Sequence, residues 1–194
     1  MKSTKWIFLL LILMLAGRTP AWTDTFPVSV TIPAANSATF TVSKVINNQF
    51  QATGNNNLSF TTTFDAENNT FLGDFFYAID VAPGGGAGGV DIDIDYADTS
   101  VNTGLGTHAI GTVVKATSNP ADGEQLLKRE ILDDLNNVTI FGNQVTGGFM
   151  RMYVGLATGD PDASPAEPAS AVPFNTGDAP GLYSGTLTLT AVQP

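Results

Sequence analysis

The sequence predicts an all-β protein: an immunoglobulin-like antiparallel β-sandwich of about 8–10 strands with one short helix or helical turn. Two observations predict this class. Apolar and polar residues alternate with a period of two in several short segments, and clusters of Asn, Gly and Pro separate those segments. The chain has no cysteine, so a hydrophobic core must stabilise it, and 43% hydrophobic against 13% charged residues can supply that core.

The clearest strand pattern lies near the carboxyl terminus, in residues 181–192. Leu187, Leu189 and Ala191 alternate there with threonines. β-Branched threonine suits the pleat of a strand, and the alternation places the aliphatic residues on one face and the hydroxyl groups on the other. We therefore predict a final strand whose aliphatic face packs on the core.

The other predicted elements follow from the same patterns. Strands are expected at 25–32, 38–46, 58–64, 71–81, 90–96, 107–116, 138–141 and 145–156. Residues 71–81 are the most continuously apolar, which predicts a central strand packed on both sides. Residues 121–135 instead have helical spacing, with Leu127, Ile131 and Leu135 on one stripe, and they are predicted to form the short helix.

Residues 1–21 have the layout of a secretory signal peptide. Lys2 and Lys5 precede an apolar run over residues 6–15, which is shorter than the ~20 residues of a membrane span, and small residues follow. Residues 22–194 are expected to form one domain. We therefore expect a secreted protein, periplasmic or extracellular and at the cell surface, without membrane contact after the signal is removed.

The charge balance restricts the partners. The chain carries 18 acidic and 8 basic residues, a formal charge of -10. Loss of Lys2, Lys5 and Arg18 with the signal segment leaves five basic residues and a charge of -13. Such a surface repels phosphate groups, so neither nucleic acid nor an anionic membrane is an expected partner.

The acidic residues of 90–98 are the one candidate metal site. Asp91, Asp93 and Asp95 share a face of the predicted strand, and Asp98 follows. These carboxylates are a candidate site for calcium, although Tyr96 stands where a calcium loop needs glycine. The alternative is a solvated face that discourages edge-to-edge association. No other cofactor is expected.

No enzyme motif is present in the sequence. His108 is the only histidine, no thiol exists, and no G-x-S-x-G segment supplies a nucleophilic serine. A non-enzymatic protein is therefore expected, although a glycosidase using two carboxylates stays open because only their separation in space decides it. Tyr77 and Tyr153 are the candidate platform residues for a carbohydrate ligand.

The last strands carry a family resemblance. Tyr153 is followed by Gly181, Tyr183 and the threonines of a Gly-x-Tyr-x-x-Thr-x-Thr-x-Thr pattern, namely Thr186, Thr188 and Thr190. This ending resembles that of secreted pilin-like β domains, the spore-coat-U and chaperone–usher fimbrial subunit group. The chain departs from that group in lacking a cysteine pair near its start.

The resemblance implies a sandwich with an open edge that associates with copies of itself or related subunits by strand addition. Phe26, Val28, Val30 and Ile32 have the alternate apolar spacing of a donated strand. The alternative is that they form the first strand of their own domain. The expected function is a structural or adhesive subunit of a bacterial surface appendage, envelope or matrix. A carbohydrate- or calcium-binding β-sandwich module is the alternative function.

Overall fold

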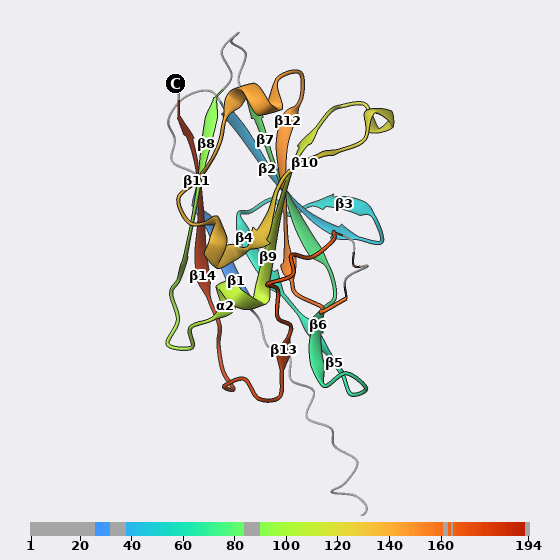
Figure 1. Cartoon of the computed structure of the whole chain (residues 1–194), viewed down its shortest axis with the longest axis vertical. Helices are drawn as coiled ribbons and strands as arrows, with labels where there is room; N and C mark the ends of the chain where they lie inside the picture. The colour runs from blue at the N-terminus through green and yellow to red at the C-terminus, as the bar shows by residue number, and fades with distance from the viewer. Residues whose placement is uncertain (1–25, 32–37, 84–89, 161–162, 164, 193–194) are drawn as a thin grey trace, which may run out of the picture.

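The computed structural model describes residues 26–31, 38–83, 90–160, 163 and 165–192, with only the backbone for 26–31 and 83 (Figure 1). The predicted signal segment, residues 1–21, and Ile32 of the predicted first strand lie outside the described residues. No helix in this part of the chain combines the length and the apolar character needed to cross a membrane.

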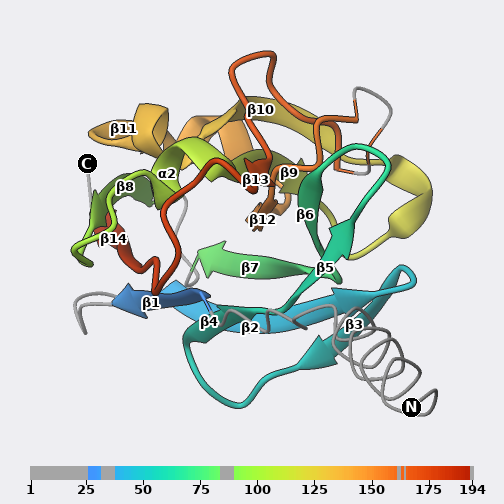
Figure 2. The ribbon, with the colours of Figure 1, turned by 90° about the horizontal axis from the view of Figure 1, so that it is seen from below.

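The described residues form an all-β sandwich, as predicted. One sheet has five strands in the order β11-β8-β14-β1-β4, a second has six in the order β10-β9-β12-β7-β2-β3, and a small sheet has the order β13-β6-β5 (Figures 1 and 2). The five-stranded sheet consists of β1 (Phe26–Thr31), β4 (Asn57–Phe60), β8 (Asp91–Asp98), β11 (Val138–Ile140) and β14 (Gly185–Val192). The six-stranded sheet consists of β2 (Ala38–Ile46), β3 (Gln49–Ala52), β7 (Phe76–Pro83), β9 (Ala109–Ala116), β10 (Gln125–Ile131) and β12 (Phe149–Leu156). The small sheet consists of β5 (Thr62–Asp65), β6 (Thr70–Gly73) and β13 (Phe174–Asn175).

Pairing within the sheets is antiparallel with one exception among the named strands. β1 runs parallel to β14, with Val28 opposite Gly185, and antiparallel to β4 on its other side. Parallel neighbours cannot be joined by a tight hairpin, and these two strands come from opposite ends of the chain. The first described strand therefore lies beside the last.

The core lies between the two large sheets, and its pattern is the one predicted for the final strand. Leu187 and Leu189 of β14 are fully buried, whereas the threonines between them remain partly exposed. The facing six-stranded sheet contributes side chains that are equally buried: Ile79, Met150, Met152 and Val154. The alternation of aliphatic and hydroxyl residues therefore separates core from solvent in β14.

The predicted central strand is shorter than expected. Residues 71–81 divide into β6 and β7, because the chain leaves the small sheet after Gly73 and enters the large one at Phe76. β7 does lie inside its sheet, between β12 and β2. The predicted strand at 58–64 divides in the same way into β4 and β5, so Phe60 is fully buried while Phe64 is 45% exposed.

The helix predicted over 121–135 is wrong. Its middle is the strand β10, which pairs with β9 so that Arg129 lies opposite Thr112. Single 3₁₀ turns flank the strand at Pro120–Asp122 and Leu132–Leu135. The strand and the second turn together bury Ile131 and Leu135, so a spacing of four residues arose without a helix. The one α-helix among the described residues is α2 (Leu105–His108), just before β9.

Candidate functional site

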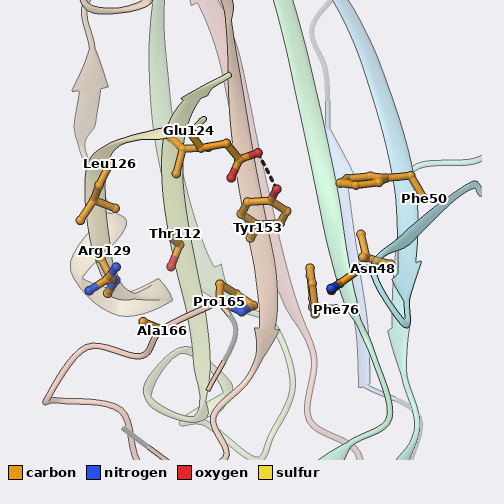
Figure 3. Close-up of a pocket in the computed structure, with 12 residues that line it drawn as sticks. Asn48, Phe50, Phe76, Thr112, Glu124, Leu126, Arg129, Tyr153, Pro165 and Ala166 are labelled. Atoms are coloured by element: carbon orange, nitrogen blue, oxygen red, sulfur yellow. Dashed lines mark hydrogen bonds between the residues drawn. The ribbon is translucent and has the colours of Figure 1, made fainter. Parts of the chain in front are cut away.

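A groove of about 370 Å³ lies on the outer face of the six-stranded sheet (Figure 3). Its volume is at the lower end of the range for small-molecule sites, roughly 300–1,000 Å³. The side chains that give it chemical character come from β3, β7, β9, β12, β10 and the residue before β10: Phe50, Phe76, Thr112, Tyr153, Arg129 and Glu124. The groove is therefore lined by three aromatic rings and several polar groups.

Strand alternation places these side chains on the outer face. On β12, Met150, Met152 and Val154 are buried in the core, so Arg151 and Tyr153 point the other way. The β2–β3 hairpin brings Phe50 to the same face. Its turn residues Asn47 and Asn48 have φ of 50° and 60°, the left-handed conformation that a two-residue hairpin turn requires and that Asn tolerates.

Arg151 and Glu124 hold the aromatic rings in place. The Tyr153 hydroxyl donates to Glu124 Oε1 at 2.7 Å (Figure 3). Arg151 Nη1 donates to the same oxygen at 3.1 Å. The Arg151 guanidinium lies 4.4 Å from the centre of the Phe50 ring, a cation–π distance. The rings of Phe76 and Tyr153 meet edge to face, with centroids 5.5 Å apart.

The electrostatics of the groove favour binding over proton transfer. Burial, and then the hydrogen bond to Glu124, raise the pKa of Tyr153 to about 12. The hydrogen bond from Arg151 to Asp80 raises the pKa of Arg151 above its already high value. Tyr153 is therefore neutral and Arg151 charged throughout the physiological range, so they present a fixed hydrogen-bonding and stacking surface.

The two predicted platform residues, Tyr77 and Tyr153, lie on opposite faces of the six-stranded sheet. Tyr153 lies in the groove, but Tyr77 is 5% exposed and its hydroxyl bonds the backbone N–H and C=O of Ser59. Tyr77 is thus a core residue, and the neighbouring Phe76 takes the outward position. Local patterns do not place Phe50, Glu124 and Arg129 in the groove, because Phe50 reaches it through the Asn47–Asn48 turn and the helical spacing of residues 121–135 conceals the strand β10.

The structure uses the four candidate metal ligands as hydrogen-bond acceptors. Asp91, Asp93 and Asp95 accept from Gly142 N, Thr139 Oγ1 and Asn137 N respectively, at 2.7, 2.6 and 3.0 Å. Asp98 accepts from the Tyr96 hydroxyl at 2.7 Å and from the backbone N–H groups of Gly104 and Gly106 at the start of α2. Among the described residues, no group of three acidic or histidine side chains is arranged to hold a metal ion.

His108 contacts residues 172–178, the segment that contains β13. It ends α2, where its Nδ1 lies 2.7 Å from the carbonyl oxygen of Val172 and its Nε2 lies 3.6 Å from Asp178 Oδ1. Its ring stacks on that of Phe174, with centroids 4.0 Å apart. The predicted strand at 107–116 includes His108, but the strand begins at the next residue, Ala109.

The candidate donor strand occupies a position between two other strands. Of its four named residues, Phe26 and Val28 lie opposite Phe60 and Leu58 of β4, and Val28 and Val30 lie opposite Gly185 and Leu187 of β14. The two neighbours of β1 therefore have no direct pairing with each other.

Comparison with known proteins adds no family to these observations. No family model, no curated protein and no solved structure matches the chain.

Proposed function

We propose that this protein is an exported, non-enzymatic structural or adhesive subunit of a bacterial surface appendage, envelope or matrix, and that it assembles by donation of β1 to a neighbouring copy. The observation that carries the proposal is the place of β1 between β14 and β4, the slot that an added strand would fill. The resemblance of the carboxyl-terminal strands to pilin-like domains agrees with it, as does the layout of residues 1–21.

The position between β14 and β4 explains why a donated strand would be held tightly. Without β1, the backbone groups of β14 and β4 that face it lose their partners, and two open strand edges result. The strands on both sides bear fully buried side chains, among them Leu58, Phe60 and Leu187. A strand from a second copy restores the same backbone pairing as the chain's own strand, which is the exchange that domain swapping uses.

Engineered disulfide bonds test this directly, because the chain has no cysteine of its own. Ser29 lies opposite Asn57 in the antiparallel β1–β4 pair. We expect that Ser29→Cys protein mixed with Asn57→Cys protein and oxidised forms a covalent dimer on a non-reducing gel. The matched control replaces Asn57→Cys by Val101→Cys, which is fully exposed and outside every strand, and should give no dimer above background.

A variant with both cysteines tests the alternative that β1 pairs only within its own domain. If β1 belongs only to its own domain, protein carrying both Ser29→Cys and Asn57→Cys forms an internal disulfide, and the mixed single variants form no covalent dimer. That pair of results would overturn strand donation.

A second candidate function is carbohydrate binding in the groove, which the aromatic lining favours. Sugars present apolar C–H faces and hydroxyl edges, and Phe50, Phe76 and Tyr153 offer rings beside the polar group of Glu124. On a glycan array, Phe50→Ala should weaken binding. Phe64→Ala is the matched control, because Phe64 is as exposed as Phe50, 45% against 47%, but lies outside the groove. Equal binding by both variants would reject the groove as the sugar site.

A further inference from the structure

We propose that the groove recognises a carboxylate-bearing sugar, a uronic acid within an oligosaccharide, and that Arg129 binds the carboxylate. This inference rests on the second candidate function, carbohydrate binding in the groove. Its starting point is a pair of polar groups that face each other across β9 and β10, Thr112 and Arg129. Both line the groove (Figure 3).

These two groups lack partners in the part of the chain that the structure describes. Thr112 is 4% exposed, and neither its hydroxyl oxygen nor Arg129 Nε takes part in a hydrogen bond, although both atoms are buried. A buried polar group without a partner costs about 1–3 kcal/mol. A ligand that bonds both atoms would remove that cost, so the site is already arranged for polar recognition.

The charge of Arg129 is the uncompensated one in the groove. Arg151 is neutralised by Asp80 at 2.6 Å and Glu124 at 3.1 Å, whereas Arg129 forms no ion pair with any described residue. A planar guanidinium pairs best with a carboxylate through two parallel hydrogen bonds. The protein is acidic overall, so it repels ligands that carry many negative charges. The unpaired arginine beside the groove attracts a single negative charge. Together these two features favour a ligand with one anionic group and an otherwise neutral surface.

The remaining lining fits the rest of a sugar. Tyr153 and Phe76 present ring surface to C–H groups, and Glu124 accepts hydrogen bonds from hydroxyl groups. A second hollow of about 200 Å³ shares Phe76 and Asn48 with the groove. The two hollows therefore adjoin, which favours an oligosaccharide over a single sugar.

Titration calorimetry on the secreted protein tests the inference with a galacturonic acid trisaccharide, its methyl ester and a neutral galactose trisaccharide. We expect the acid to bind, and Arg129→Gln to weaken its binding roughly tenfold or more because a charge-assisted pair is lost. Arg129→Lys keeps the positive charge but cannot donate two parallel hydrogen bonds to a carboxylate. Its affinity for the acid should therefore lie between those of the parent protein and Arg129→Gln. Lys128→Gln, the adjacent basic residue of β10, is the matched control and should bind like the parent protein.

The outcomes separate this inference from the function on which it rests. Acid and methyl ester binding equally, with no effect of Arg129→Gln, would overturn carboxylate recognition and leave the groove as a neutral sugar site. If neither the parent protein nor Phe50→Ala binds any of the trisaccharides, both carboxylate recognition and carbohydrate binding in the groove would be overturned. Salt gives an independent readout: added sodium chloride should weaken binding of the acid and leave the neutral trisaccharide unaffected. Circular dichroism confirms that each variant is folded.

Discussion

Arg151 and Asp80 form a two-bond ion pair across neighbouring strands of the six-stranded sheet. Arg151 Nε and Nη2 donate to the two Asp80 carboxylate oxygens at 2.6 and 2.8 Å, and the residues lie directly opposite each other in β12 and β7. The side chains are only 17% and 26% exposed. The pair therefore fixes the guanidinium that in turn contacts Phe50 and Glu124 beside the groove.

Arg151→Gln should lower the free energy of unfolding by about 1–3 kcal/mol, because it leaves the Asp80 carboxylate mostly buried without its partner. Urea denaturation of the purified protein measures the change. Lys128→Gln is the control, since its pair with Glu130 is 39% and 31% exposed, and it should change stability by less than about 0.5 kcal/mol. Equal losses in the two variants would contradict a structural role for the Arg151 pair.

Gly185→Ala should destabilise the protein by about 1–3 kcal/mol through overpacking. A Cβ atom at residue 185 would overlap the ring and hydroxyl of Tyr96, which is itself buried on the neighbouring strand. Gly73→Ala is the control, because its Cβ would meet the nearest atom, Leu156 Cβ, at 3.4 Å, an ordinary contact. Thermal unfolding should show a lower midpoint for the Gly185 variant only, and the reverse order would refute the packing argument.

Local alternation was enough to predict β8 and β14, because one face of each is buried and the other is not. Leu189 and Ile94 lie opposite each other and are fully buried, and the polar residues on either side of each are partly exposed. The same reasoning failed for β10. Its pairing with β9 is a contact between distant parts of the chain, and the backbone bonds it supplies outweigh a helical spacing that only three residues support.

Thr139→Val should lower the free energy of unfolding by about 1.5–3 kcal/mol, because the Thr139 hydroxyl donates to the Asp93 side chain at 2.6 Å and so attaches β11 to β8. Thr188→Val, in β14 on the other side of β8, removes a hydroxyl that forms no hydrogen bond with the described side chains and should be nearly neutral. Urea denaturation measures both variants.

Millimolar calcium should leave the unfolding midpoint of the parent protein unchanged, because the acidic row already accepts hydrogen bonds from the β11 region. A midpoint that rises with calcium in the parent protein but not in Asp93→Ala would instead establish a cation site.

The candidate site was less predictable than the fold because it depends on residues from several strands. Tyr153 was found from its outward position in β12, since that strand alternates cleanly. Choosing between Phe76 and Tyr77 required knowing where β7 begins, and a shift of one residue reverses the face of each ring. Thr112 and Arg129 become neighbours only through the pairing of β9 with β10, which no local pattern reveals.

Because of Tyr96, the free energy of unfolding should fall as the pH rises above about 10. Its side chain is 4% exposed, and burial, together with the hydrogen bond it donates to Asp98 at 2.7 Å, raises its pKa far above the ordinary value near 10. The unfolded chain releases this proton at about pH 10 while the folded protein keeps it. The stabilisation is therefore fully present below about pH 10 and falls as the pH rises further.

Urea denaturation from about pH 8 to about pH 11 should show this decline, and it should be shallower in Tyr96→Phe, which has no proton to lose at that position. At pH 8 the variant should be less stable than the parent protein, because the hydrogen bond to Asp98 is lost. Since only the parent protein then loses the contribution of Tyr96, the stability difference between the two proteins should shrink as the pH rises. Tyr153→Phe is the comparison. The pKa of Tyr153 is raised to about 12, above the highest pH measured, so the stability difference for this variant should also shrink between about pH 10 and about pH 11. A stability difference for Tyr96→Phe that stays constant over this range would show that the Tyr96 hydroxyl is not protected from ionisation by the fold.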